Sequence, residues 1–156
     1  MTGAPEPRLT GRVLALDVGR RRIGLAVSDE LGLTAQGLET LERANYRADL
    51  EALARLAARW NAALLVVGHP VKLSGEEGRQ AEWVRQFAER LAAHTRLPVK
   101  LWDERLTTVE AERVLKQSGI SIAKRARAKD RLAAVLLLQS YLDHQASSAA
   151  APGVLE

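Results

Sequence analysis

Residues 13–27 read VLALDVGRRRIGLAV, two apolar runs separated by a short turn that is rich in arginine. Runs of this length bounded by turn residues are typical of β-strands, and Gly19 supplies the backbone freedom that a tight turn needs. We predict an antiparallel hairpin with strands at 13–16 and 23–27. The first strand leads directly into Asp17, an acid at a place where an apolar residue is expected.

Helical and strand patterns alternate after this hairpin. Helices are expected over residues 46–60, 84–91, 107–119 and 130–144, and further strands over 63–67, 99–102 and, more weakly, 33–41. Strands that alternate with helices pair in parallel through crossover connections. The sequence therefore predicts an α/β fold with a five-stranded mixed sheet, an antiparallel opening hairpin and helices on both faces.

The length of 156 residues fits one compact domain, and we see no internal repeat. We interpret residues 1–11 as a flexible N-terminal segment, 12–145 as the folded domain and 146–156 as a disordered C-terminal tail. The N-terminal residues lack the apolar centre of a secretory signal, and the longest apolar run, 132–138, is too short to cross a bilayer. We expect a cytoplasmic protein without a membrane segment.

Charge and cysteine content restrict the chemistry. The formal net charge is +4 and the sequence pI is about 9.8, a basic excess that favours polyanions such as nucleic acid. Because the chain has no cysteine, it has no thiolate nucleophile and no cysteine zinc site. Any metal must be bound by oxygen or imidazole, which favours hard cations.

Three acidic positions stand where an acid is locally unexpected. Asp17 ends one apolar strand, Asp103-Glu104 ends another, and Asp130 opens a very apolar helix. Each has a plain structural interpretation, as a turn former, a solvated pair and a helix cap. Strand ends and helix starts on one side of a sheet can nevertheless converge. A convergent cluster of carboxylates suits two Mg²⁺ or Mn²⁺ ions, which can activate water and stabilise a leaving oxygen.

Basic residues lie next to these acids in the sequence. Charge runs are usually solvated surface. Their adjacency to the acids makes phosphate contact the better interpretation, and Arg105 has a secondary claim because it can equally pair with Asp103. The candidate nucleic-acid-binding residues are Arg20, Arg21, Arg22, Arg105, Lys124, Arg125, Arg127 and Lys129.

Four motifs follow one another along the chain, namely residues 17–29, residues 68–70 with 74–75, residues 103–108, and residues 129–130 with 133–134. In this order they resemble the YqgF family, also called RuvX, of pre-16S rRNA nucleases, over about residues 12–143. The resemblance implies a ribonuclease H-like fold related to the RuvC-type Holliday junction resolvases. It also implies a role in maturing the 5′ end of the small-subunit ribosomal RNA precursor.

The same resemblance implies that Asp17, Glu104 and Asp130 are the catalytic acids and bind the metal. The chain departs from the family at His69, where Leu is frequent, and at Ser74, where an acid is frequent. Ser74 cannot replace a carboxylate ligand, so a fourth acidic ligand from that loop is in doubt. His69 is expected in a loop from which it can reach the substrate.

The main prediction is a metal-dependent hydrolase that cuts phosphodiester bonds of structured RNA. Branched DNA is an alternative substrate, because nothing in the sequence reads the sugar. A non-catalytic RNA-binding ribosome assembly factor is an alternative of another class, which Ser74 permits. The segment 17–19 also resembles the phosphate loop of actin-like ATPases, but the chain is too short for their two lobes. Oligomeric state, including a homodimer, and exonuclease or endonuclease action stay open.

Overall fold

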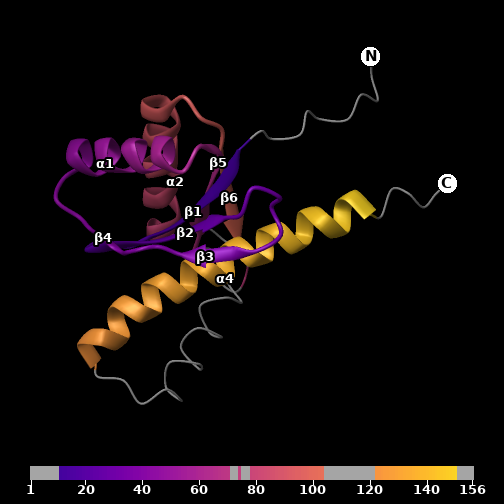
Figure 1. Cartoon of the computed structure of the whole chain (residues 1–156). Helices are drawn as coiled ribbons and strands as arrows, with labels where there is room; N and C mark the ends of the chain where they lie inside the picture. Colours follow the sequence, from indigo (N-terminus) through magenta and orange to yellow (C-terminus); the bar gives the residue numbers. More distant parts are fainter. Residues whose placement is uncertain (1–10, 71–73, 75–77, 104–121, 151–156) are drawn as a thin grey trace.

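The computed structural model describes residues 11–70, 74, 78–103 and 122–150, and within the last range it describes side chains for residues 128–146. A sheet forms the centre of the molecule (Figure 1). Helices α1 (Tyr46–Arg59) and α2 (Arg79–Thr95) cover one face, and α4 (Ile122–Ala150) crosses the other. The predicted α/β architecture with helices on both faces is therefore confirmed.

In the part of the chain that the structure describes, the sheet has six strands. They are β1 (Arg12–Val18), β2 (Arg22–Ser28), β3 (Ala35–Gly37), β4 (Leu41–Glu42), β5 (Ala62–His69) and β6 (Val99–Asp103). Their order is β3-β2-β1-β5-β6, and β4 also pairs with β2. Strand β1 is antiparallel to β2 and parallel to β5, which is parallel to β6, so the sheet is mixed as predicted.

The predicted count of five strands was low by one. The weak strand expected over 33–41 is two short strands, and both pair with β2. Between them, Leu38 packs its side chain against the core while its carbonyl oxygen accepts a hydrogen bond from Arg131 Nε at 3.1 Å. The N–H of Leu38 still donates a hydrogen bond to the carbonyl oxygen of Leu25 in β2 at 2.9 Å. The register with β2 shifts by one residue between β3 and β4, which divides the strand in two. Neither this shift nor the contact with Arg131 has a signature in the local sequence.

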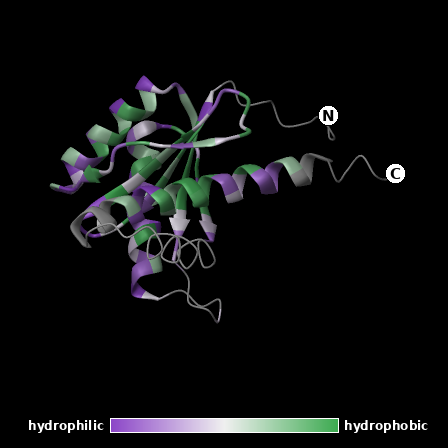
Figure 2. Cartoon of the chain, turned by 60° about the horizontal axis from the view of Figure 1, so that its bottom comes forward, coloured by the Kyte–Doolittle hydropathy of each residue, from purple (hydrophilic) through white to green (hydrophobic). Residues whose placement is uncertain are grey.

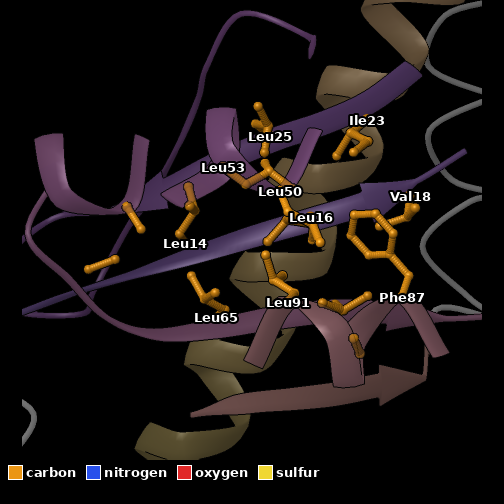
Figure 3. Packing of buried hydrophobic residues seen from close by; sticks show 14 of the residues in the cluster. Leu14, Leu16, Val18, Ile23, Leu25, Leu50, Leu53, Leu65, Phe87 and Leu91 are labelled. Atoms are coloured by element: carbon orange, nitrogen blue, oxygen red, sulfur yellow. The ribbon is translucent and has the colours of Figure 1, made fainter. Parts of the chain in front are cut away.

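Side chains of the central strands alternate between two apolar clusters. Leu14 and Leu16 of β1 belong to the cluster under α1 and α2, which also contains Phe87 (Figure 3). Val13 and Ala15 belong to the cluster under α4. Because β1 is buried on both faces, it reads as one continuous apolar run rather than as an alternating pattern. Its penultimate residue, Asp17, is therefore a polar exception in a buried strand.

Helix α1 has the predicted cap, because Asn45 Oδ1 accepts a hydrogen bond from the backbone N–H of Ala48 at 2.9 Å. The helix expected around 84–91 is also confirmed and is longer, spanning the whole of α2. The helix expected over 107–119 lies outside the described residues. Figure 2 shows that the strands in the middle of the fold are predominantly apolar, whereas the helices carry polar residues on their outer faces.

The last helix is longer than predicted at both ends. It begins at Ile122 rather than Asp130, and it continues to Ala150, past residue 146 where we expected the tail to begin. Alanine, lysine and arginine favour helix but leave no apolar stripe in residues 123–129, so hydrophobic periodicity did not reveal the first turns. Among the described residues, no helix is both long and apolar enough to cross a membrane.

We expect Leu137→Ala to lower the free energy of unfolding by about 2–5 kcal/mol, because Leu137 is fully buried where α4 packs on the sheet. Leu31→Ala is the matched control, since Leu31 is 80% exposed and should change stability by less than about 0.5 kcal/mol. Urea unfolding of both variants measures the difference. Equal stabilities of the two variants would show that α4 does not cover this face.

Candidate active site at the carboxyl ends of the central strands

Asp17 lies on the face of the sheet that α4 covers. It is half-buried near the end of β1, two residues after Ala15, which packs under α4. In the ladder between β1 and β2, Asp17 pairs with Gly24. Directly paired residues of antiparallel strands project from the same face, so Gly24 would direct a side chain to the face that carries Asp17.

Gly24 is the point where α4 comes closest to the sheet. A Cβ atom added at Gly24 would collide with the backbone carbonyl group of Asp130. The backbone of Asp130 therefore lies directly over the residue that pairs with Asp17. Two of the three predicted acids, far apart in the sequence, are thus brought to neighbouring positions on one face of the sheet.

Glycine flanks Asp17 on both sides in the sheet. Gly24 is its partner in β2, and Gly68 of β5 lies one residue beyond Val67, which pairs with Leu16. Neither neighbour has a side chain to cover the Asp17 carboxylate. From the sequence, Gly68 was recognised only as part of a motif, because this arrangement becomes visible only when the strand register is known.

The third predicted acid, Glu104, lies outside the described residues, as does Arg105. Strand β6 ends at Asp103, so Glu104 follows the last residue of a strand whose carboxyl end lies beside that of β5. The described residues alone include no group of three acidic or histidine side chains that could hold a metal ion. The predicted ligand set thus combines Asp17 and Asp130, which the structure describes, with Glu104, which it does not.

Arg22 forms an ion pair with Asp130, with 2.8 Å between Nε and Oδ2. The side chains are 29% and 24% exposed, so the pair is only partly shielded from water. The hydrogen bond from Arg22 to Asp130, and then the charge of that carboxylate, raise the pKa of Arg22. We predicted that Arg22 binds nucleic acid. In this structure its guanidinium offsets the charge of a predicted metal ligand.

The other predicted basic residues are distributed over two elements. Arg20 and Arg21 are exposed in the turn between β1 and β2, and the Arg20 guanidinium carbon lies 5.8 Å from the centroid of the Trp83 ring. Lys129 is half-buried in α4. Lys124, Arg125 and Arg127 lie in the first two turns of α4, where the structure describes the backbone alone.

His69 does not lie in a loop as expected but is the last residue of β5. The strand alternation places it on the face opposite Asp17, since its neighbour at the second position, Val67, belongs to the cluster under α1 and α2. Burial, and then the positive charge of Arg85, lower the pKa of His69, while Asp103 opposes this shift.

An ion pair that the sequence did not reveal as important contacts the basic turn from the side of α1 and α2. Arg43 and Asp49 form a buried ion pair, and Arg43 Nη1 also donates a hydrogen bond to the carbonyl oxygen of Gly19 at 3.1 Å. The sequence signal that could have revealed them is Asp49, an acid on the side of α1 that carries the buried apolar residues. Their partners come from several elements, which sequence spacing cannot show.

Comparison with known proteins identifies related sequences. A family model described as RuvX, Holliday junction resolvase, matches residues 11–144. The chain is 54% identical over 135 residues to a protein of Koribacter versatilis, and 51% identical over 132 residues to one of Syntrophus aciditrophicus. The alignments cover 86% and 85% of this chain and 88% of each relative. Both relatives carry the name "Putative pre-16S rRNA nuclease".

Solved structures with the same fold are more distant in sequence. RuvC of T. thermophilus in complex with Holliday junction substrate has a TM-score of 0.57 and 17% identity, covering 88% of this chain and 97% of that one. The yeast mitochondrial Holliday junction resolvase has a TM-score of 0.55 and 12% identity, covering 92% and 82%. At these identities the likeness establishes the fold, and the predicted ribonuclease H-like fold is confirmed.

We expect Gly24→Ala to destabilise the protein by about 1–3 kcal/mol, because the new methyl group must displace the backbone of Asp130. Gly32→Asn is the control. Gly32 has a φ of 71° and no atom within 4 Å of an added Cβ, and asparagine tolerates this conformation. Urea unfolding should show a smaller loss for the control. Wild-type stability of Gly24→Ala would contradict the close approach of α4.

His69 should make stability depend on pH. Its folded pKa lies below the ordinary value of 6.5, so the unfolded chain binds this proton more readily. The stability of the wild type relative to His69→Leu should therefore be greatest above pH 6.5 and should decline as the pH falls through 6.5 towards the folded pKa. Thermal unfolding between about pH 8 and about pH 5 tests this. A stability difference between the two proteins that stays constant over this pH range would contradict the lowered pKa of His69.

Proposed function

Because the chain belongs to the RuvX family, it is a nuclease, a hydrolase of phosphodiester bonds, and we propose that it matures the 5′ end of pre-16S ribosomal RNA. Relatives that are 54% and 51% identical carry a name with this activity, which favours RNA as the substrate. Nucleic acid is the substrate class. We propose that this nucleic acid is RNA, and we propose the metal and the catalytic residues below.

One observation supports this mechanism most directly. Asp17 and Asp130 share one face of the sheet, and glycines flank Asp17 at its own level. Exposed Arg20 and Arg21 stand at the end of the same strand. The two acids thus lie near a turn whose exposed arginines a nucleic-acid backbone can contact.

The donor atoms fit a hard divalent cation. Carboxylate oxygens are the ligands that Mg²⁺ and Mn²⁺ prefer, and we propose that Asp17, Glu104 and Asp130 hold one or two such ions. When bound, the ions would supply the Lewis acidity that activates water and stabilises the leaving oxygen. Arg22 has a supporting role, because its ion pair fixes the Asp130 carboxylate at the site.

Phosphate contacts would come from the arginines of the turn and from the first turns of α4. Arg20 and Arg21 are exposed, so they can approach phosphates without breaking into the core. We assign the same role to Arg105, Lys124, Arg125, Arg127 and Lys129, as expected from the sequence. Such contacts position the substrate and carry no base specificity, and they make affinity fall as salt rises.

A four-way DNA junction is the second candidate substrate. The family model is described as Holliday junction resolvase, and the T. thermophilus neighbour is bound to such a junction. A resolvase must cut two symmetric strands, so this candidate goes with a homodimer, which we retain as a prediction. An activity on pre-ribosomal RNA would place the protein in the cytoplasm, with residues 12–145 as the catalytic domain.

We expect Asp17→Asn to lower the rate of cutting by about a hundredfold or more. Even residues around metal ligands commonly contribute 10–100-fold, and Asn removes the charge of a proposed ligand. The matched control is Asp143→Asn, an exposed acid of α4 outside the site. Each protein is incubated with Mg²⁺ or Mn²⁺ and either a pre-16S RNA fragment or a four-way DNA junction, and products are separated on gels.

The outcomes separate the candidates. Equal cutting by wild type and Asp17→Asn would expose a contaminant and defeat the assignment of Asp17. Cutting of the RNA alone supports the proposed maturation role, and cutting of the junction alone selects the resolvase. If neither is cut but RNA is bound with strong salt dependence, the protein is a non-catalytic assembly factor.

A further inference from the structure

A nearly buried ion pair lies behind the basic turn. Arg43 Nε and Asp49 Oδ2 are 2.9 Å apart, and the two side chains are only 9% and 3% exposed. Arg43 follows β4, and Asp49 lies in the first turn of α1. This pair is outside the carboxylate cluster, and no step of the proposed reaction uses it.

The surroundings fix the Arg43 guanidinium in one orientation. Its central carbon lies 5.6 Å from the ring centroid of Tyr46, 5.3 Å from that of Trp83 and 5.1 Å from that of Phe87. Asp49 completes the enclosure, and its second oxygen accepts a hydrogen bond from the backbone N–H of Ala44 at 2.9 Å. A planar cation between rings and a carboxylate has little rotational freedom.

This fixed guanidinium contacts the turn between β1 and β2. Arg43 Nη1 donates to the carbonyl oxygen of Gly19 at 3.1 Å, and the backbone N–H of Arg43 donates to the carbonyl oxygen of Arg21 at 2.8 Å. The turn itself is closed by the bond from the N–H of Gly19 to the carbonyl oxygen of Arg22 at 2.9 Å. Arg43 therefore contacts both sides of the turn.

The ring of Trp83 contacts the outer side of the turn as well as Arg43. Trp83 lies against Arg43 at 5.3 Å and against Arg20 at 5.8 Å. Arg20 is exposed and is one of the proposed phosphate ligands, whereas Arg43 is buried. Trp83 thus contacts both a buried cation and an exposed one.

We propose that Arg43, oriented by Asp49, is a positioning residue that holds the turn of residues 19–22 so that its exposed arginines can bind phosphate. Burying two charges is expensive, and a well-packed apolar pair often gives similar stability, so stability alone is a weak reason for this pair. An ordered turn loses less conformational freedom when it binds. The inference rests on the proposed function, since it assumes that the turn contacts nucleic acid.

Arg43→Lys tests the inference. Lysine keeps the charge but lacks the planar fork that bonds Asp49 and Gly19 at once. Arg47→Lys is the matched control, because Arg47 is 89% exposed and pairs with Glu51 within α1. Binding of a fluorescent pre-16S RNA fragment is measured in EDTA over a range of salt concentrations, so that cutting plays no part. Amide exchange at Gly19 reports the turn without any ligand.

We expect Arg43→Lys to weaken binding several-fold and to reduce the slope of log affinity against log salt by about 0.7–0.9 for each phosphate that the turn no longer neutralises. Exchange at the Gly19 amide should become faster, and Arg47→Lys should change neither quantity. A second control, Ser28→Ala, removes a buried hydrogen bond to the N–H of Val13 at the other end of the hairpin. It should lower thermal stability and leave the salt slope unchanged.

Three results would overturn the inference. One is wild-type exchange at Gly19 together with a wild-type salt slope in Arg43→Lys. Another is a reduced slope in Ser28→Ala as well, which would trace the effect to general destabilisation. The third is faster exchange with unchanged binding, which would separate the turn from phosphate contact. If the wild type binds no RNA, the proposed function fails, and Gly19 exchange alone decides whether Arg43 holds the turn.

Discussion

Helix α4 packs against β2 so closely that the carbonyl group of Asp130 occupies the space that a side chain at residue 24 would need. Only glycine permits this approach. The contact places the start of the apolar part of α4 over the strand that pairs with Asp17, and it joins segments separated by more than a hundred residues. The second apolar cluster and the two neighbouring carboxylates both depend on this approach.

Charge is arranged in three layers around the turn between β1 and β2. Asp17 lies on the sheet face that α4 covers, Asp130 of α4 approaches the same face, and Arg22 offsets the charge of Asp130. Arginines are exposed at the tip of the turn. On the other face, Arg43 and Asp49 neutralise each other among aromatic rings. Binding of a polyanion needs the arginines at the tip of the turn to be exposed. We infer that the ion pairs on the two faces of the sheet limit how far the turn can move.

The sequence was most informative where one local signal had one explanation. Apolar runs bounded by turn residues identified β1, β2, β5 and β6, and Asn45 identified the start of α1. The split into β3 and β4 was missed because the register with β2 shifts by one residue between them, beside the contact of Leu38 with Arg131 of α4. The first turns of α4 were missed because residues 123–129 favour helix without forming an apolar stripe.

Residue chemistry alone excluded thiolate ligands and predicted the class of site, namely hard oxygen ligands next to cations in an α/β fold. Only the tertiary structure decided whether the predicted acids lie close together, because strand register and the approach of the helix determine which distant residues share a face. Register placed Asp17 between two glycines and moved His69 to the opposite face. Packing paired Arg22 with Asp130 and enclosed Arg43 with Asp49. These contacts join residues from separate elements, and local sequence patterns carry no information about such distances.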